Sequence, residues 1–162
     1  MILLRHLGQS SRRRWYSSSK NARATLGGFD ILSSVDPGET RVIVRGYGDH
    51  AFQINDVLVQ QSVILLPKSF YLWNAKTFSD ITIESLALFQ VLYPTLEVLF
   101  VGCGEHLPGL LPAEVTSYFK SKGIVIEQSN SANAAASFNF LNAEGRNVAA
   151  ALLTLQPPPI QT

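Results

Sequence analysis

One short loop in the sequence brings together the side chains that are best suited to chemistry. Gly102-Cys103-Gly104-Glu105-His106 directly follows the apolar run 96–101, a pattern typical of a buried strand. A cysteine reacts as its thiolate, which a neighbouring histidine can generate, so Cys103 and His106 are candidates for a nucleophile and its base. Open α/β sheets also bind their ligands beyond the carboxyl ends of their strands. The loop is therefore the first candidate for a binding or catalytic site.

The same loop also has a purely structural interpretation. Cys103 would then be a small buried residue in a tight turn, whose backbone the two glycines make possible. The glycine spacing differs from that of a nucleophile elbow. It also lacks the third glycine of the dinucleotide fingerprint, since position 107 is leucine, and the chain has no glycine-lysine-serine or glycine-lysine-threonine phosphate loop. The sequence favours the structural interpretation and leaves small-molecule binding open.

A second charged group ends an expected helix just before a core strand. In Glu144-Gly145-Arg146, the arginine could pair with Glu144, with Glu105 or with Glu127, or it could stand in an ordinary solvated turn. The chain has a single cysteine and no histidine pair at helical spacing, so neither a disulfide nor a metal centre is expected. No other cofactor is indicated.

The elements that would position these residues differ between the two halves of the domain. The first half is typical of consecutive antiparallel strands, with a hairpin turn at Gly46-Tyr47-Gly48-Asp49. The second half alternates strands and helices, which implies parallel pairing through right-handed crossovers. The expected strands are 41–45, 50–54, 57–59, 63–66, 70–73, 96–101, 124–127 and 148–155, and the expected helices are 83–93 (stopped by Pro94), 112–122 and 131–144.

The predicted class is therefore α/β, in layers. A βαβαβ C-terminal half follows a β-rich N-terminal half, which would form an antiparallel extension or a second small sheet. The predicted domain spans residues 30–155, and a proline-rich tail occupies 156–162. No apolar run approaches the roughly 18 residues that a membrane-spanning helix needs.

The N-terminal segment has the composition of a mitochondrial presequence. Residues 1–29 contain six basic residues and no acid, whereas the rest of the chain has seven basic and twelve acidic residues. The segment is also rich in serine, as matrix-targeting peptides are. A secretory signal is disfavoured because Arg5 interrupts the first apolar residues, and a nucleic-acid-binding arm because the acidic body offers it no continuous basic surface. Arg14-Trp15-Tyr16-Ser17 resembles a matrix processing site, which predicts cleavage after Tyr16.

Four segments in order resemble one family across roughly residues 41–155. They are Gly46-Tyr47-Gly48 with Phe52-x-Ile54-Asn55, Leu65-Leu66-Pro67 with Trp73, Val101-Gly102-Cys103-Gly104-Glu105, and the stretch from Ser137 to Leu152 that includes Phe138-Asn139 and Glu144-Gly145-Arg146. The family is a small α/β family of archaea and bacteria whose mitochondrial branch is respiratory complex I assembly factor 3. The chain departs from the family at Cys103, where other members commonly carry threonine.

The resemblance implies a three-layer α/β fold with a mixed sheet, no enzymatic activity and no cofactor. It also implies action in the mitochondrial matrix, or at the matrix face of the inner membrane as a peripheral protein. The implied partners are complex I assembly factor 4 and early quinone-module subunits, with no nucleic acid. The candidate contact residues are the loop Gly102–His106 together with Asn139, Glu144 and Arg146. The alternative is a small-molecule-binding or redox enzyme that uses the same loop.

Overall fold

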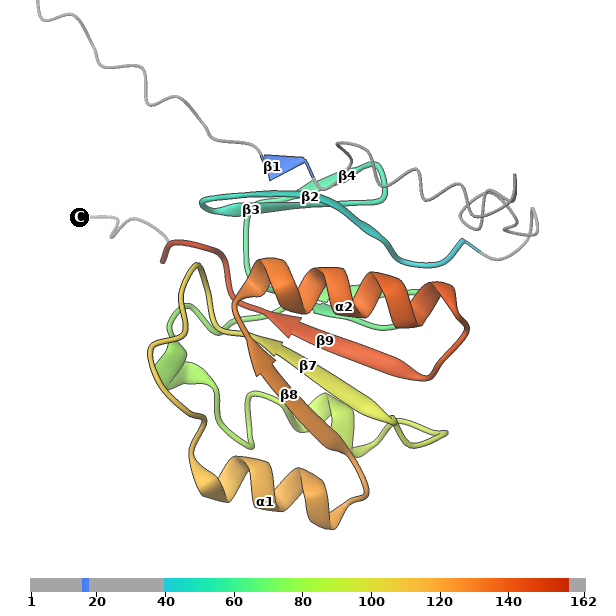
Figure 1. Cartoon of the computed structure of the whole chain (residues 1–162), viewed down its shortest axis with the longest axis vertical. Coiled ribbons are helices and arrows are strands. Elements are labelled where there is room, and N and C mark those ends of the chain that lie inside the picture. Colours follow the sequence, from blue (N-terminus) through green and yellow to red (C-terminus); the bar gives the residue numbers. More distant parts are fainter. Residues whose placement is uncertain (1–15, 18–39, 158–162) are drawn as a thin grey trace, which may run out of the picture.

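The computed structural model describes residues 16–17 and 40–157, and these form two β-sheets and two α-helices (Figure 1). The first sheet, here the hairpin sheet, is antiparallel in the order β1-β2-β3-β4, and the second, here the mixed sheet, has the order β6-β5-β9-β7-β8. The strands are β1 (Tyr16–Ser17), β2 (Val44–Gly48), β3 (Ala51–Ile54), β4 (Val57–Val59), β5 (Val63–Leu65), β6 (Phe70–Leu72), β7 (Val98–Gly102), β8 (Val125–Ser129) and β9 (Val148–Leu152). The helices are α1 (Ala113–Ser121) and α2 (Ser131–Ala143), with short 3-10 turns η1 (Phe78–Asp80) and η2 (Ala87–Gln90).

The mixed sheet confirms the predicted α/β class. Strand β7 pairs in parallel with both β8 and β9, through crossovers that contain α1 and α2. Strand β5 pairs antiparallel with β9 and with β6, which makes the sheet mixed. The presequence lies outside the described residues except for β1, and so does the tail beyond position 157. None of the helices in the described part of the chain is long and apolar enough to cross a membrane.

Local sequence signals explain where the two helices begin and end. Helix α1 starts after Pro112, with Glu114 in its first turn and Lys120 in its last, so both charges interact favourably with the helix dipole. Helix α2 is capped by Asn130, whose side chain accepts the amide hydrogen bond of Asn133 (2.8 Å). It ends before Gly145, whose φ of +80° suits a residue without a side chain.

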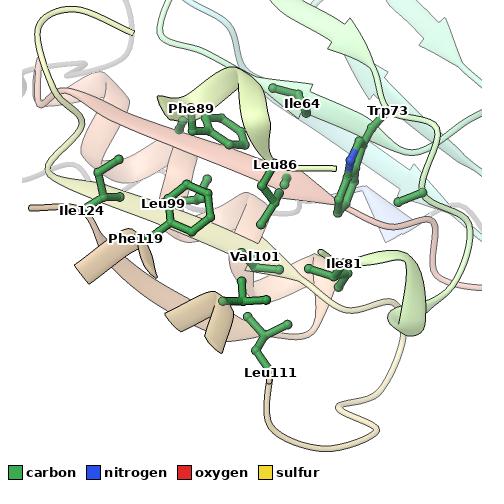
Figure 2. Close-up of a cluster of buried hydrophobic side chains, with 14 of the residues drawn as sticks. Ile64, Trp73, Ile81, Leu86, Phe89, Leu99, Val101, Leu111, Phe119 and Ile124 are labelled. Carbon is green, nitrogen blue, oxygen red and sulfur yellow. The ribbon is translucent and has the colours of Figure 1, made fainter. Parts of the chain in front are cut away.

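The mixed sheet is the middle layer of the domain, with an apolar cluster on each face. One cluster joins it to α2 and the hairpin sheet, and the other joins it to α1 and the irregular segment that contains η1 and η2 (Figure 2). All five side chains of β9 are buried, as expected for a strand covered on both faces. Phe138 of α2 and Phe119 of α1 are fully buried on opposite faces, and each burial stabilises the fold by roughly 1.5–3 kcal/mol.

The predicted helix 83–93 is wrong, because side chains take the backbone groups that a helix would use. The carbonyl of Ser85 accepts the indole N–H of Trp73 (3.0 Å) instead of a helical amide. The hydroxyl groups of Thr82 and Ser85 each accept a hydrogen bond from the other residue's backbone amide (3.0 and 3.1 Å). Such local bonds compete with the helical pattern. The segment therefore forms only the short turn η2. Its apolar side chains cover one face of the mixed sheet, which explains why its composition resembles that of a buried helix.

The hairpin is confirmed, but the predicted turn at 46–49 is misplaced. Strand β2 continues through Gly46 and Gly48, and the chain reverses at Asp49-His50. A register shift between Val44 and Gly46 marks a β-bulge. Glycine inside a strand often accompanies such a bulge, and both glycines belong to β2, with Gly46 beside the bulge and Gly48 as the last residue of the strand.

Candidate functional site

The loop Gly102–His106 lies at the carboxyl edge of the parallel strands, where it was predicted, but its backbone is taken up by packing. The amide of Cys103 donates to the carbonyl of Ser129 (2.9 Å), and the amide of Glu105 donates to that of Leu155 (2.9 Å). The amide of Leu153 donates to the carbonyl of Gly102 (2.9 Å). These bonds join the loop to the ends of β8 and β9, which leaves the backbone little freedom to receive a ligand.

Ser131, at the start of α2, is hydrogen-bonded to the loop and to the end of β9 and so closes this edge of the sheet. Its hydroxyl accepts the amide hydrogen bond of Gly104 (2.9 Å) and donates to the carbonyl of Leu153 (2.6 Å). Its own amide donates to the carbonyl of Gly104 (2.8 Å). A Cβ atom on Gly102 would lie 2.7 Å from Cα of Ser131 and 2.9 Å from Cδ2 of Leu152. At the N-terminus of α2, where a helix could bind an anion, the amide of Ser131 is thus bound by the carbonyl of Gly104 and the amide of Asn133 by the side chain of Asn130.

Cys103 is placed as a core residue. It is only 6% exposed, and its Sγ lies 3.9 Å from the carbonyl oxygen of Val101. Burial raises the pKa of the Cys103 thiol to about 11, which keeps it protonated and unreactive at neutral pH. His106, whose side chain is 86% exposed, lies 3.9 Å from the carboxylate of Glu105. No hydrogen bond joins Cys103 to His106 in the described part of the chain, so the geometry favours the structural interpretation of the cysteine.

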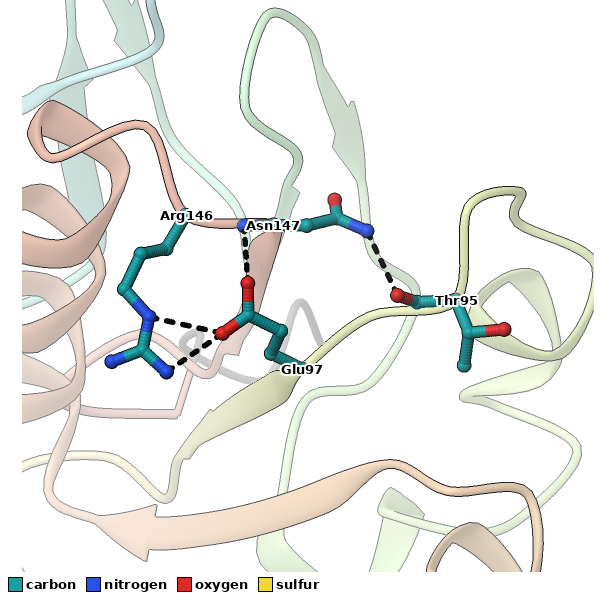
Figure 3. Close-up of polar contacts among 4 residues, drawn as sticks. All are labelled: Thr95, Glu97, Arg146 and Asn147. Atoms are coloured by element: carbon teal, nitrogen blue, oxygen red, sulfur yellow. Dashed lines mark hydrogen bonds and ion pairs between the residues drawn. The ribbon is translucent and has the colours of Figure 1, made fainter.

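Arg146 pairs with Glu97, which corrects the three partners considered from the sequence, Glu144, Glu105 and Glu127 (Figure 3). Its Nε and Nη2 atoms donate to Oε2 of Glu97 at 3.0 and 2.7 Å. The reason is the parallel register, in which Val98 of β7 lies beside Val148 of β9. The residues that precede the two strands therefore meet at the amino edge of the sheet.

Asn147 completes this cluster at the amino edge. Its amide donates to Oε1 of Glu97 (3.3 Å), and its side chain donates to the carbonyls of Pro94 (3.0 Å) and Thr95 (2.9 Å). The hydrogen bonds from Arg146 and from the Asn147 amide lower the pKa of Glu97. Both charged side chains of the pair remain nearly half exposed. The sequence analysis missed Glu97 and Asn147, although their positions just before parallel strands were the available signal.

Asn139 joins α2 to the hairpin sheet. Its side chain donates to the carbonyl of Val44 (2.8 Å) and accepts from the amide of Val44 (2.9 Å). It thus forms the two hydrogen bonds that a neighbouring strand would otherwise form with Val44. Asn142, one turn later and missed from the sequence, donates to the carbonyls of Val42 (2.9 Å) and Pro67 (3.1 Å). The spacing of the two asparagines places them on one helix face, which was the signal for a shared structural role.

The candidate residues therefore do not form one site. Glu105 and His106 lie beyond the carboxyl end of β7, whereas Glu144 and Arg146 lie in the connection that precedes β9, at the opposite edge of the mixed sheet (Figure 1). Glu144 is exposed at the end of α2. Among the described residues, no group of three or more histidine, cysteine, aspartate or glutamate side chains is arranged to hold a metal ion.

A surface hollow lies away from the predicted loop, and none of its lining residues belongs to that loop. It has a volume of about 530 Å³ and is lined by Trp73, Asn74, Ala75, Ser79, Asp80, Thr82, Glu84 and Ser85. The carboxylate of Asp80 is engaged in the turn itself, because Oδ2 accepts the amides of Lys76 and Thr77 (both 2.9 Å). These hydrogen bonds lower the pKa of Asp80. Its acid group thus stabilises the local fold.

Comparison with known proteins identifies the family. Residues 44–153 match a family described as "Protein of unknown function (DUF498/DUF598)". The chain is 32% identical to NADH dehydrogenase (ubiquinone) 1 alpha subcomplex assembly factor 3 of Rattus norvegicus, over 96% of this chain and 85% of that protein. The chain belongs to the assembly factor 3 family. The relative of the same name from Danio rerio is 41% identical over 72% of this chain.

This assembly factor 3 family member spans 65% of the Danio rerio protein and 64% of the one from Xenopus tropicalis, to which it is 37% identical over 73% of its own length. Its fold also occurs in solved bacterial structures. A crystal structure from Bordetella parapertussis is similar with a TM-score of 0.67 at 31% identity, covering 73% of this chain and 99% of that one. A solution structure of a Mth938-like domain from Bordetella pertussis has a TM-score of 0.64 at 25% identity, covering 76% and 92%.

Proposed function

We propose that this chain is a non-enzymatic assembly factor for mitochondrial respiratory complex I, acting on early quinone-module intermediates. The observation that carries the proposal is its identity of 32–41% to proteins named as assembly factor 3 of the NADH dehydrogenase (ubiquinone) 1 alpha subcomplex in frog, fish and rat. The proposed partners, complex I assembly factor 4 and early quinone-module subunits, are those that the resemblance to this family implies.

The closed carboxyl edge supports a non-enzymatic role. In α/β enzymes this edge holds the ligand. Here, Ser131 and Gly102 pack against each other, and the raised pKa keeps Cys103 protonated at neutral pH. A redox or small-molecule enzyme that used this loop would need to break these contacts before it bound its substrate, so the assembly role fits the geometry better.

The exposed members of the predicted set are proposed as partner contacts. Glu105 and His106 would serve one face, and Glu144 and Arg146 another, because they stand at opposite edges of the mixed sheet. Gly102, Cys103, Gly104 and Asn139 would act indirectly, since their contacts hold the two sheets and α2 in place.

The presequence, location and processing also belong to this proposal. The basic residues of segment 1–29 would direct the chain to the matrix, where it acts in solution or as a peripheral protein at the inner membrane. Cleavage after Tyr16 would leave a mature chain that begins with Ser17. N-terminal sequencing of the protein recovered from mitochondria tests this position, and a different first residue would refute it.

Affinity capture with crosslinking from mitochondria tests the proposed function. The full chain with a C-terminal tag is expected to recover assembly factor 4 and quinone-module subunits. The control is an unrelated matrix protein that carries residues 1–29 and the same tag, which should recover neither. Recovery of the chain without any complex I subunit or assembly factor would contradict the proposal.

A further inference from the structure

The two outer strands of the mixed sheet, β6 and β8, differ in how the sides that face away from the sheet are protected. Beside β8, the side chain of Gln128 donates to the carbonyl of Gly109 and accepts from the amide of Leu111 (2.9 Å), which holds this loop against the strand. Strand β8 also carries the exposed carboxylate of Glu127. Charged side chains and covering loops are common means by which proteins keep an outer strand from pairing with another chain.

Strand β6 carries no such charge. Residues 69–75, which include the whole strand, contain no charged side chain. Tyr71 is 51% exposed and Leu72 is 62% exposed. In the part of the chain that the structure describes, the only strand paired with β6 is β5. An exposed, uncharged, apolar outer strand of this kind is a template for pairing with another strand.

The hydrogen bonds between β5 and β6 show which backbone groups of β6 point outward. The amide of Leu66 donates to the carbonyl of Ser69 (2.8 Å), and the amide of Trp73 donates to the carbonyl of Ser62 (2.8 Å). Directly opposite residues in an antiparallel pair are hydrogen-bonded and non-hydrogen-bonded in alternation. Between Ser69 and Trp73, Tyr71 is therefore bonded to β5, whereas the residues on either side of it turn their backbone groups away from β5.

These two residues are Phe70 and Leu72. Among the described residues, none forms a hydrogen bond with the amide or the carbonyl of either one. The outward side of β6 therefore presents two donors and two acceptors, two residues apart along the strand. This spacing allows β6 to pair with an identical strand that runs in the opposite direction.

A second copy of the chain supplies the complementary groups. In an antiparallel pairing centred on Tyr71, Phe70 of each copy lies opposite Leu72 of the other, and each such pair exchanges two hydrogen bonds. All the outward groups of both strands are then used. Tyr71 lies opposite Tyr71 of the second copy, on the face of the sheet that carries Ile64. Each exposed apolar side chain of β6 thus meets another apolar side chain, as stable cross-strand pairs require.

We propose that β6 is a homodimer interface, through which the mixed sheets of two copies join into one continuous sheet about a two-fold axis at Tyr71. The pairing uses the same surface on both copies, so it closes on itself and produces a dimer without longer polymers. The inference goes beyond the proposed function, because it concerns the association of the chain with itself. The strand is short, so a weak dimer is expected, with a dissociation constant between about 1 μM and about 1 mM.

Charge substitutions at the two-fold axis test both the dimer and its register. Each of Tyr71→Lys and Tyr71→Glu, in the full chain, places like charges directly opposite each other and should raise the dissociation constant of the dimer about tenfold or more. Sedimentation equilibrium measures this constant. An equimolar mixture of the two variants places opposite charges at the axis, so it should dimerise more tightly than either variant alone. Thermal unfolding checks that both variants are folded.

Val125→Lys is the matched control, because Val125 is 56% exposed on the other outer strand. This variant should dimerise as tightly as the wild-type chain. A wild-type chain that remains monomeric at about 1 mM would overturn the proposal. The same conclusion would follow from a dimer that Tyr71→Lys leaves unchanged, from an equal loss in Val125→Lys, or from a mixture no tighter than the single variants.

Hydrogen exchange of the wild-type chain gives a measurement that needs no variant. The amides of Phe70 and Leu72 should exchange more slowly as the protein concentration rises through the dimer transition. The amide of Ile126 is the internal control, since it points outward from β8, where the neighbouring Val125 donates to the carbonyl of Glu97 (3.3 Å). Its exchange should not change with concentration. Dimerisation without slower exchange at Phe70 and Leu72 would contradict the interface.

Discussion

The two edges of the parallel strands differ in what they do with their polar groups. At the carboxyl edge, backbone amides and the buried hydroxyl of Ser131 bind one another, and Gly102 lets α2 approach closely. At the amino edge, Glu97 and Arg146 form an ion pair that stays nearly half exposed. The edge that holds the ligand in α/β enzymes is therefore tightly packed here, apart from the exposed side chains of Glu105 and His106, and the Glu97–Arg146 ion pair lies at the opposite edge.

This difference between the two edges shows that the fold alone does not determine where, or whether, a ligand binds. The topology alone would place a ligand beside Cys103, but the contacts of the side chains and backbone decide otherwise. The packed carboxyl edge contributes to stability through close contacts that leave no space for added atoms. The exposed Glu97–Arg146 ion pair contributes through an electrostatic interaction that solvent weakens. Substitutions at the two edges should therefore have very different effects.

Gly102→Ala should have the largest effect. The added Cβ would lie 2.7 Å from Cα of Ser131, so either α2 or β7 must move. Overpacking of this kind destabilises by about 1–3 kcal/mol, and contact with backbone places the expected loss at the upper end. Chemical denaturation measures it. Gly109→Ala is the matched control, since a Cβ there would meet no atom within 4 Å. Equal stability of the two variants would mean that the carboxyl edge is not tightly packed.

Ser131→Ala should have the next largest effect. It removes the acceptor for the amide of Gly104 and the donor to the carbonyl of Leu153, both buried. Leaving buried groups without partners costs about 1–3 kcal/mol. Ser121→Ala, which removes one exposed hydrogen bond to the carbonyl of Tyr118, should change the free energy of unfolding by less than about 0.5 kcal/mol. A similar loss in both variants would contradict the role of Ser131.

Ionisation of the buried Cys103 thiol should destabilise the protein, and this should happen only at alkaline pH. Its pKa in the folded state is raised to about 11, so its contribution to stability is complete below its ordinary pKa of 9.0 and is lost as the pH rises through 11. Comparing the unfolding free energies of the wild-type and Cys103→Ser chains between pH 8 and 11 should show a gap that changes in this range. Rapid labelling of the native thiol at pH 7 would show instead that it is accessible and ionised.

Glu97→Gln should have the smallest effect. The pKa of Glu97 is lowered from its ordinary value of 4.5, so its contribution is present above that value and is lost as the pH falls through the lower folded-state pKa. The variant should be slightly less stable than the wild type at pH 7, by less than Ser131→Ala, and equally stable in acid. Thermal unfolding at both pH values measures this. A large loss at pH 7 that persists in acid would mean that the pair has a structural role beyond its charge.

The sequence predicts the periodic elements better than the contacts between them. The signals at Pro112, Asn130 and Gly145 are local, so the ends of α1 and α2 could be predicted closely. The segment 83–93 has the composition of a buried helix, but the Trp73–Ser85 bond that prevents the helix joins distant positions. The partner of Arg146 likewise depends on strand register. The burial of Cys103 could be predicted because cysteine is commonly buried. The hydrogen bonds that Ser131 forms with Gly104 and Leu153 could be found only from the packed structure.

In the proposed function, this chain assists assembly without catalysing a reaction at the Gly102–His106 loop. The most direct measurement is the amount of complex I in mitochondria that lack the native protein and are given the Cys103→Ser chain. Because the buried thiol is not a nucleophile in this account, Cys103→Ser should restore complex I to the level that the wild-type chain restores. If the variant is imported and accumulates normally but restores no complex I, the non-enzymatic account is contradicted.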